Sequence, residues 1–582
     1  MSAILGLNFH HADSSACLVI DGKLVGAVAE ERLGIRQKHT SAFPENAIRW
    51  LLSDNGLKVS DLSHVAVPRN ITANRQAKIR YVLENPSKGV KAALEHFSRS
   101  YEGTSLLDRI AEINGEDPAV AKFKTVPVEH HLAHIASSYY CSPFDDITAG
   151  FSYDSSGDFV SAMAARCEGT KIDILDRVML PDSLGFFYTA LCQFIGFDTF
   201  GEEYKVMGLA PYGDDEYADV MKDLIELPQD SWFRLRKGAF GMHEGGSSGK
   251  LSQNGQVETG KLWREPVSKA LGKATERGTI TQREMNIARS VQVRFEEAAI
   301  HCLNKLHAMV PTEQLVMAGG CALNGVANAR ILRDTAFATP YLQAASSDDG
   351  TCVGAAFWAY HNVVGGTERF HMQHAFWGPE YGALRCRKAV KSTGLQFKEC
   401  ADDAELVAEA SELIAEGRVT GWYQGRSEWG PRALGNRSIL ANPANPTMKD
   451  SINAKIKRRE SFRPFAPSVL KEDVNTYFEQ DVYSPFMMHV VKLRPEWREK
   501  LPAITHVDGT GRLQSVDADS NPLYHALISA VKTWTGVGMV LNTSFNENEP
   551  VVDTPEQAVD CFMRTDMDAL CIGRFVVTKP RP

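Results

Sequence analysis

A strand, an acidic loop and a hairpin follow one another twice in the first part of this chain. The first copy spans residues 4–29 and turns its hairpin at Asp21-Gly22, and the second spans residues 147–175 with a turn at Gly169. Such a repeat predicts two related halves that face each other, a kind of fold that holds ATP phosphates between the two loops. Two unrelated hairpins would give the same pattern by coincidence.

Two histidines precede the second copy. His130 and His134 lie four residues apart in a stretch that tolerates a helix, so their imidazoles would share one helix face and could hold a cation. Asp154 follows in a Ser/Gly-rich turn, and Asp349 offers a further oxygen ligand. The HExxH metalloprotease motif is excluded because His131 stands where it needs Glu. The pattern predicts a metal site beside a phosphate loop; core histidines and a turn-capping Asp349 are the alternative reading.

Paired glycines mark a third element. A short strand at 314–317 runs into Gly319 and Gly320, and a helical pattern begins just after Asn324. Glycines after a strand let the backbone approach a nucleoside or a phosphate closely, although they also occur in plain tight turns.

The second part of the chain contains a local excess of positive charge. Residues 418–463 hold ten Lys/Arg and three acids, whereas the whole chain has a net charge of -9. These arginines alternate with Gly, Pro and aromatic residues, which favours a rigid pocket for phosphate or carboxylate over a solvated basic surface. A compact cluster in an acidic protein also argues against nucleic-acid binding.

The length and composition set the class of protein. A chain of 582 residues should form two or three domains, and the Gly-rich stretch 362–383 is the best boundary. We expect no membrane-spanning segment and no signal peptide. Eleven cysteines without a CxxC pair predict a reducing, cytoplasmic location.

Several longer motifs resemble one enzyme family. The segments SEWGPRALGNRSI, IKRRESFRPFAPSVL and NTSFNENEPVV, supported by HHLAH and GGCALN, are similar to those of NodU/CmcH-type O-carbamoyltransferases, which include tobramycin carbamoyltransferase. The resemblance spans nearly the whole chain. It implies an α/β protein with a duplicated actin/Hsp70-like (ASKHA) domain at 1–370, similar to the tRNA threonylcarbamoyl-transferase ATPases, and a YrdC-like domain at 371–582.

The resemblance also implies a reaction. Carbamoyl phosphate and ATP, with Mg, would form carbamoyl adenylate in the YrdC-like domain, and a hydroxyl of a small-molecule natural product would then take the carbamoyl group in the first domain. The metal would be Fe(II), with Mn or Zn also compatible with two imidazoles and carboxylates. The metal ligands implied are His130, His134, Asp154 and Asp349; the nucleotide loop is Gly319, Gly320 and Asn324; the adenylate-forming residues are Arg432, Lys457, Arg463, Arg512 and Ser544.

Two further residues are implied near the first loop. Lys38 resembles a transfer-site lysine, and His11 would be a general base, although this chain has a shifted His-His-Ala-Asp loop where the family carries a single His before Asp. Because no CxxC pair is present, the chain is unlike the zinc-containing hydrogenase-maturation relatives. Two other functions stay open: an actin/Hsp70-type ATPase that binds a client, and threonylcarbamoyl transfer to tRNA. No nucleic-acid or membrane partner is expected, and a homodimer is possible.

Overall fold

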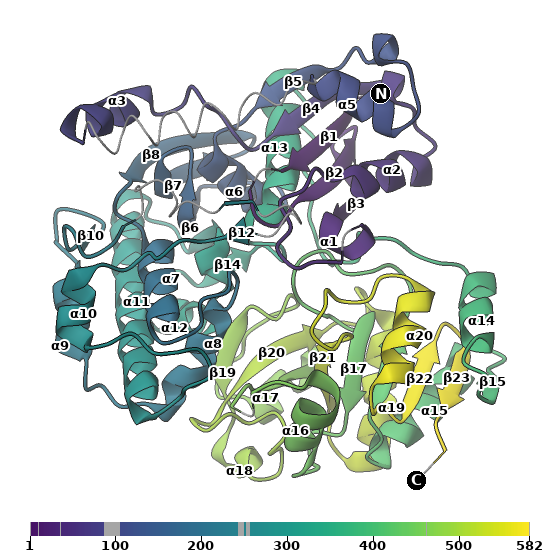
Figure 1. The fold of residues 1–582 in the computed structure, drawn as a ribbon. Coiled ribbons are helices and arrows are strands. Elements are labelled where there is room, and N and C mark those ends of the chain that lie inside the picture. Colours follow the sequence, from purple (N-terminus) through teal and green to yellow (C-terminus); the bar gives the residue numbers. More distant parts are fainter. Residues whose placement is uncertain are drawn as a thin grey trace. The chain divides into compact units, whose positions relative to one another are not determined.

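The computed structural model describes residues 2–9, 11–34, 36–85, 105–241, 250–251, 257–460 and 462–580. The chain divides into two compact units, Met1–Met372 and Gln373–Pro582 (Figure 1).

Two five-stranded sheets form the centre of the first unit, and they have the same topology. In each, three antiparallel strands are followed by two parallel ones. The first sheet runs β3 (Lys23–Ala29), β2 (Ser15–Ile20), β1 (Ala3–Asn8), β4 (Leu62–Val67), β5 (Lys124–Pro127). The second runs β8 (Lys171–Met179), β7 (Val160–Glu168), β6 (Thr148–Gly157), β13 (Gln314–Ala318), β14 (Thr339–Leu342).

This equal strand order confirms the duplication and the actin-like class of the first unit. One detail differs from the expected loop at 154–158. Strand β6 continues through Asp154 to Gly157, with an irregular register between Tyr153 and Gly157. A bulge of this kind turns side chains out of the regular alternation, which lets Asp154 leave the strand face.

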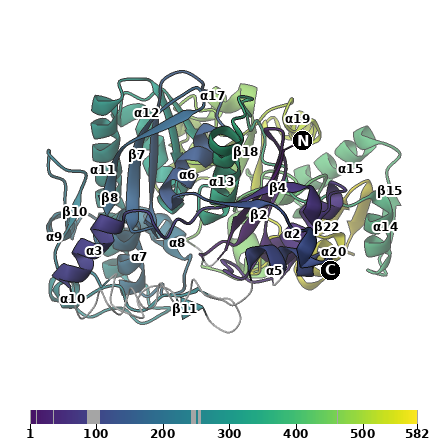
Figure 2. The same cartoon turned by 90° about the horizontal axis from the view of Figure 1, so that it is seen from above.

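Two helices connect the halves. Helix α6 (His130–Tyr139) follows the first sheet but packs on β6 and β13 of the second, and α13 (Thr351–Ala359) follows the second sheet but packs on β1, β2 and β4 of the first. The two helices also pack on each other, and both views show them side by side (Figures 1 and 2). Residues at their N-terminal ends therefore meet where the two halves adjoin.

The remaining elements of the first unit surround this core. The long helix α11 carries a capping box, in which Thr281 and Glu284 satisfy each other's backbone N–H groups. The helices are α1 (Glu30–Leu33), α2 (Glu45–Asp54), α3 (Arg75–Glu84), α5 (Leu106–Ile113), α7 (Leu184–Phe194), α8 (Glu203–Leu209), α9 (Ala218–Leu224), α10 (Glu265–Leu271), α11 (Gln282–Met309) and α12 (Gly325–Asp334), and the short strands are β9 (Ile225–Glu226), β10 (Arg234–Leu235), β11 (Lys250–Leu251) and β12 (Val257–Glu258).

The second unit is built on one mixed nine-stranded sheet. Its apolar core packs α15 and α19 against the strands, with Leu406, Trp422 and Leu527 fully or almost fully buried. The strand order is β15 (Phe397–Glu399), β23 (Phe575–Thr578), β22 (Ala569–Ile572), β16 (Thr420–Tyr423), β17 (Arg437–Ala441), β21 (Met539–Ser544), β18 (Ala466–Leu470), β20 (Thr510–Val516), β19 (His489–Lys492).

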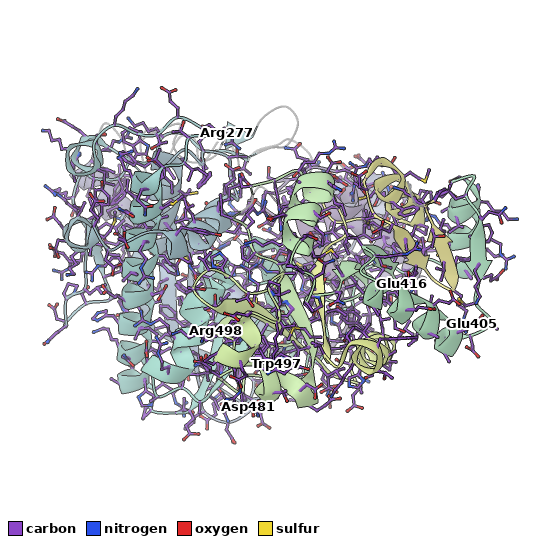
Figure 3. All side chains as sticks on the ribbon, turned by 90° about the horizontal axis from the view of Figure 1, so that it is seen from below. Arg277, Glu405, Glu416, Asp481, Trp497 and Arg498 are labelled. Atoms are coloured by element: carbon purple, nitrogen blue, oxygen red, sulfur yellow. The ribbon has the colours of Figure 1, made fainter. Side chains whose placement is uncertain are left out.

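Short helices complete this unit. Trp497 and Arg498, labelled in Figure 3, belong to α18 and fix the edge of the sheet: the Trp497 ring meets Tyr477 edge-on at 4.8 Å, and Arg498 donates to Glu479 at 2.7 Å. The helices are α14 (Ala383–Lys391), α15 (Asp403–Ala415), α16 (Met448–Ser451), α17 (Val474–Tyr477), α18 (Pro495–Arg498), α19 (Pro522–Thr535) and α20 (Pro555–Arg564).

Among the described helices, none has both the length and the apolar character needed to cross a bilayer.

Candidate functional site

Four ligand-type side chains converge at the point where the two halves of the first unit meet. His130 and His134 come from α6, Asp154 from the bulge of β6, and Asp348 from the turn before α13. One nitrogen or oxygen of each lies within 4.8 Å of the others. The cluster thus draws on both halves, which is why no single stretch of sequence contains it.

The distances suit a cation. His130 Nε2 and His134 Nε2 are 3.1 Å apart, and they lie 3.3 Å and 3.5 Å from Asp348 Oδ1; His134 Nε2 is also 3.3 Å from Asp154 Oδ2. Two imidazole nitrogens this close can share only one proton, whereas a metal ion between them would bind both lone pairs. Two nitrogen and two carboxylate donors fit Fe(II), Mn or Zn.

The fourth ligand differs from the prediction, because Asp348 occupies the place expected for Asp349. The Asp349 carboxylate instead accepts from the N–H of Gly350 at 3.0 Å, as a turn-capping aspartate does. Burial raises the pKa of Asp349 well above its usual value, and Asp13 and Glu31 raise it further. The run Ser-Ser-Asp-Asp-Gly holds two adjacent carboxylates, and only the backbone of the turn decides which of them faces α6.

The charges within the cluster support one another. Although burial acts to lower it, the carboxylates of Asp348, Asp154 and Asp158 raise the pKa of His130 to about 9. The pKa of Asp348 is held well below its usual range by His130 and His134, against the opposing effect of burial. His130 and the carboxylates are therefore opposite charges in the absence of a cation, and a bound cation would replace the proton.

Other polar contacts hold the helix that carries the histidines. His131 is fully buried, its Nδ1 lying 2.9 Å from Ser152 Oγ and its Nε2 3.0 Å from the Val160 carbonyl. Asp158 accepts from the His130 N–H at 3.0 Å and so caps the start of α6. His131 is therefore a core histidine that fixes the orientation of its two neighbours.

The paired-glycine loop lies beside this cluster. Gly320 N–H donates to Asp154 Oδ2 at 2.8 Å. At Gly319, where φ is +103°, an added Cβ would lie 2.1 Å from the Tyr153 carbonyl oxygen, so this position requires glycine. Asn324 caps α12 through the Ala327 N–H and exchanges hydrogen bonds with Gln292. The loop therefore approaches the metal-type cluster, while Asn324 holds the helix that follows.

The two predicted residues of the N-terminal loops lie in different places. His11 is half-buried and its ring stacks on that of His130 at 5.1 Å, so it forms part of the wall of the cluster. Lys38 is exposed in a turn. His39, which the sequence reasoning missed, lies next to it and binds Asp13 at 2.7 Å.

The second unit gathers arginines. Burial lowers the pKa of Arg512 well below its usual value, and the nearby charges of Arg432, Arg463 and Arg459 lower it further. Burial also lowers the pKa of Arg432 to about 10. Among the residues described, neither Arg432 nor Arg512 forms an ion pair. Arg463 pairs with Glu460 at 3.8 Å. Arginines gathered in this way can bind an anion, and Arg459 is the member that sequence reasoning missed.

The sheet explains how the arginine cluster forms. Arg512 and Gln514 are two residues apart on β20, so their side chains lie on the same face of the sheet. The same holds for Asn542 and Ser544 on β21. Gln514 and Asn542 bond to each other at 3.0 Å, so the two pairs share one face, and they hold the carbonyls of Leu434 and Ala433 above it. This contact places Arg432, the preceding residue, over the face that carries Arg512.

Lys457 and Ser544 lie together. The Lys457 ammonium donates to Ser544 Oγ at 3.3 Å and to Asn546 Oδ1 at 2.6 Å. Lys457 is almost completely buried and ends a π-helical turn, Ile452–Lys457. It therefore fixes the loop that follows β21, and Asn546 is a further member of this group.

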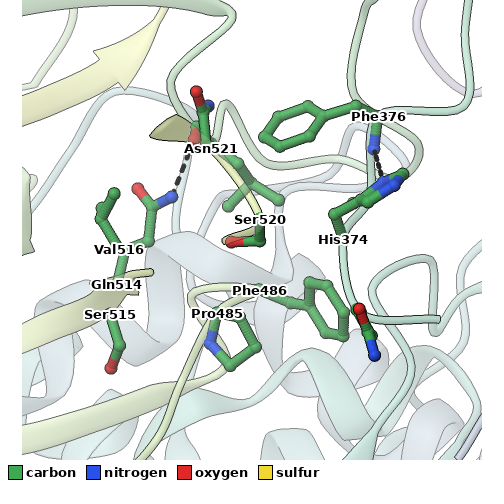
Figure 4. A pocket seen from close by; sticks show the side chains of 12 residues that line it. His374, Phe376, Pro485, Phe486, Gln514, Ser515, Val516, Ser520 and Asn521 are labelled. Atoms are coloured by element: carbon green, nitrogen blue, oxygen red, sulfur yellow. Dashed lines mark hydrogen bonds between the residues drawn. The ribbon is translucent and has the colours of Figure 1, made fainter. Parts of the chain in front are cut away.

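The loop that carries Arg432 is held by a single carboxylate. Glu428 Oε1 accepts three backbone N–H groups, from Leu434 at 2.8 Å, Asn436 at 2.9 Å and Arg437 at 3.0 Å. A small pocket opens beside this loop, and His374, Phe376, Phe486 and Asn521 are among its lining residues (Figure 4). The Phe376 N–H donates to His374 Nδ1 at 3.3 Å and orders one wall of the pocket.

Comparisons with known proteins agree with both units. Residues 3–357 match the family description "Carbamoyltransferase N-terminus", and residues 411–579 match "Carbamoyltransferase C-terminus". The nodulation protein NolNO of Sinorhizobium fredii is 36% identical, over 97% of this chain and 79% of its own length. An uncharacterized protein of Synechocystis sp. is 35% identical, over 100% of this chain and 97% of its own.

More distant similarities were also found. The 3'-hydroxymethylcephem-O-carbamoyltransferase of Amycolatopsis lactamdurans is 31% identical, over 59% of this chain and 58% of its own length. Among solved structures, the T. kodakarensis HypF matches with a TM-score of 0.31 and 12% identity, over 62% of this chain and 48% of that chain. The fold class given above follows from the strand orders of this chain itself.

Proposed function

The chain belongs to the carbamoyltransferase family, and from this premise we propose that it is an ATP-dependent O-carbamoyltransferase that acts on a hydroxyl group of a small natural product. The family membership makes it a carbamoyl-transferring enzyme. Relatives whose names state carbamoyl transfer to a hydroxymethylcephem support a small-molecule alcohol as acceptor, of the kind found in antibiotic biosynthesis.

The observation that carries the ATP-dependent step is the arginine cluster of the second unit. Two arginines of this cluster, Arg432 and Arg512, are half-buried and have no ion-pair partner among the described residues. An anionic ligand such as ATP with Mg, or carbamoyl phosphate, would compensate their charge. In the proposed reaction, water attacks the phosphorus of carbamoyl phosphate and releases inorganic phosphate and carbamate, and a carbamate oxygen then attacks the α-phosphorus of ATP. Pyrophosphate leaves and carbamoyl adenylate remains. Arg432, Arg463 and Arg512 would stabilise the charge that develops on the phosphoryl oxygens.

The transfer step belongs to the first unit in this proposal. His130, His134, Asp154 and Asp348 would hold the metal, which when bound supplies a Lewis acid beside the nucleotide phosphate. The Gly319-Gly320 backbone would approach the nucleotide, because glycines carry no side chain and the Gly320 N–H lies at the cluster, 2.8 Å from Asp154 Oδ2. Lys38, in the turn after α1, and His11, in the loop after β1, would face the transferring group.

Release of pyrophosphate in response to carbamoyl phosphate tests the first step. We expect Arg463→Ala to lower this release about 100-fold or more, because an oriented phosphate donor is lost. Arg574→Ala is the matched control, since Arg574 is an exposed arginine of the same unit that pairs with Asp403 at 3.1 Å. Unchanged pyrophosphate release in Arg463→Ala would contradict the proposal. Hydrolysis of ATP to ADP at a rate that does not depend on carbamoyl phosphate would also contradict it and would favour a client-binding ATPase.

The acceptor is found by mass spectrometry. The protein is incubated with ATP, carbamoyl phosphate and a panel of aminoglycoside, macrolide, β-lactam and alkaloid alcohols, and the products are searched for the mass of one added carbamoyl group. Modification of tRNA alone, with no alcohol carbamoylated, would favour the threonylcarbamoyl alternative.

A further inference from the structure

We propose that His39 is the general base that takes the proton of the acceptor hydroxyl, and that Asp13 is its positioning residue. This inference rests on the proposed carbamoyl transfer and assigns a residue that the sequence motifs did not single out. It is carried by a hydrogen-bonded Asp-His pair that is linked to the turn of the metal-type cluster and whose second ring nitrogen has no hydrogen-bond partner among the described residues.

The pair is held firmly. Asp13 Oδ1 lies 2.7 Å from His39 Nδ1, and its other oxygen accepts from Ser347 Oγ at 2.8 Å. The backbone N–H of His39 donates to Glu31 Oε2 at 2.9 Å. Both Asp13 and His39 have φ of +57°, a backbone conformation that non-glycine residues adopt at a cost and that is frequent at functional sites. Because a carboxylate accepts from Nδ1, that nitrogen carries the proton and Nε2 is left as the basic atom.

The His39 ring is partly exposed. The His39 side chain is 35% exposed, and Nε2 has no hydrogen-bond partner in the part of the chain that the structure describes. The Gly201 backbone packs against Nε2, and a Cβ added there would lie 2.2 Å from this nitrogen, so a larger residue would displace the ring. The Phe200 ring meets the imidazole edge-on at 5.4 Å and supports it.

The segment that carries Gly201 is also fixed. Arg277, labelled in Figure 3, donates to Asp198 Oδ1 at 2.6 Å and to Glu202 Oε1 at 2.8 Å, one on each side of Phe200 and Gly201. The backbone that packs against Nε2 is therefore held on both sides.

The pair lies beside the metal-type cluster. Ser347, which binds Asp13, immediately precedes Asp348. The dyad is thus connected through one hydrogen bond to the turn that carries a ligand of the cluster. His11, the alternative base, stacks on the ligand His130 and belongs to the wall of the cluster.

The proton transfer completes the reaction balance. The hydroxyl oxygen bonds to the carbamoyl carbon, the bond from that carbon to the phosphate oxygen breaks, and AMP leaves with the electron pair. The hydroxyl proton moves to His39 Nε2, and the new imidazolium is stabilised by Asp13, as in hydrolase triads. After AMP and product leave, the proton passes to water.

The surroundings of His39 give the pH dependence. Burial acts to lower its pKa, but Asp13 from the loop after β1, Glu31 from α1 and Glu203 from α8 raise the pKa to about 9. The neutral base is the active form, so the transfer rate should rise about tenfold per pH unit below that value and level off above it.

The first test separates the two half-reactions. With the panel alcohol that turns over fastest, His39→Gln should lower transfer about 100- to 10,000-fold and remove the rise with pH, while carbamoyl-phosphate-dependent pyrophosphate release stays within about twofold. Added imidazole should restore part of the transfer. His64→Gln on β4 is the control and should keep the rate and profile of the wild type. If the wild type releases no pyrophosphate, the proposed function fails, and not this assignment.

The second test needs no acceptor. A difference between the histidine NMR titrations of wild type and His39→Gln should identify one imidazole that titrates near pH 9, and Asp13→Asn should move that titration to lower pH. Gly201→Ala should slow transfer with the titration still present. Three results would overturn the proposal. His39→Gln could keep the wild-type rate and pH profile, or His11→Gln could be the one variant that loses the rise with pH. The third is an imidazole titration near pH 9 that does not move in Asp13→Asn.

Discussion

Two arginines five residues apart in one loop should respond in opposite ways to the same substitution. Arg432 is half-buried and has no ion pair in the described part of the chain. Arg437 is fully buried, and its guanidinium lies over the Tyr423 ring at 3.8 Å. We expect Arg432→Met to stabilise the second unit and Arg437→Met to destabilise it. The Arg437 guanidinium donates to the carbonyl oxygens of Gln424, Gly425, Pro379, Asn436 and Asp553.

The structure sets the magnitudes. Burial lowers the pKa of Arg432 to about 10, and that fall corresponds to about 3 kcal/mol of desolvation in the native state. Methionine keeps much of the side-chain volume but loses some contacts and no longer needs hydration, so a net gain of about 2 kcal/mol is expected. In Arg437→Met, several buried carbonyls lose their donor, which should lower the free energy of unfolding by about 3–5 kcal/mol.

Calorimetry at neutral pH measures both changes. The transition of the second unit is the one that Arg437→Met lowers, and for a unit of this size Arg432→Met should raise it by about 4–8 °C. We expect inorganic pyrophosphate to stabilise the wild type but not Arg432→Met, and Arg432→Met should lower pyrophosphate release in the assay about 100-fold. A lower melting temperature in Arg432→Met would refute the view that this arginine has no ion pair and binds an anionic ligand. Stabilisation of Arg432→Met by pyrophosphate would refute it as well.

Three further outcomes follow from the first unit. Asp348→Asn should lower bound metal, measured by elemental analysis after equilibration with Fe(II), Mn or Zn, whereas Asp349→Asn should keep it; the reverse result would restore the assignment made from sequence. Gly319→Ala should destabilise the first unit by about 2–4 kcal/mol in urea unfolding, because its Cβ would lie 2.1 Å from a carbonyl oxygen at a positive φ, and a wild-type midpoint would contradict the close approach. Since the pKa of His39 is raised to about 9, its stabilisation is complete below its ordinary pKa and is lost as pH rises through 9; we expect about 1–2 kcal/mol after solvent screening, and Asp13→Asn should abolish this pH dependence.

Local spacing in the sequence predicted the repeated unit well. The hairpin turns at Asp21-Gly22 and near Gly169 were predicted correctly, because Asp and Gly have strong local preferences for turn conformations. The helical placement of His130 and His134 was also correct, since an i, i+4 pair on a helix shares one face wherever the helix packs. The loop expected at Asp154 was in fact a bulged strand, and a bulge has no fixed sequence signal.

For residues that come together from distant strands, the sequence predicted the kind of residue but not which of them are in contact. The sequence shows a run of arginines, but it does not show that Arg512 on β20 faces the loop of Arg432, because this depends on strand register across the nine-stranded sheet. Glu428, which fixes that loop through three N–H groups, gave no signal beyond being an acid in a basic stretch.

The sequence by itself therefore determined which chemistry is available: a helical histidine pair, a glycine loop that permits close approach, and arginines for an anion. The tertiary structure alone decided which atoms meet. It placed Asp348 in the cluster in place of its neighbour Asp349, and it joined Asp13 to His39. The physical reason is that α6 and α13 each leave one half of the first unit and pack on the other, so the contacts that form the site are long-range ones that no local pattern encodes.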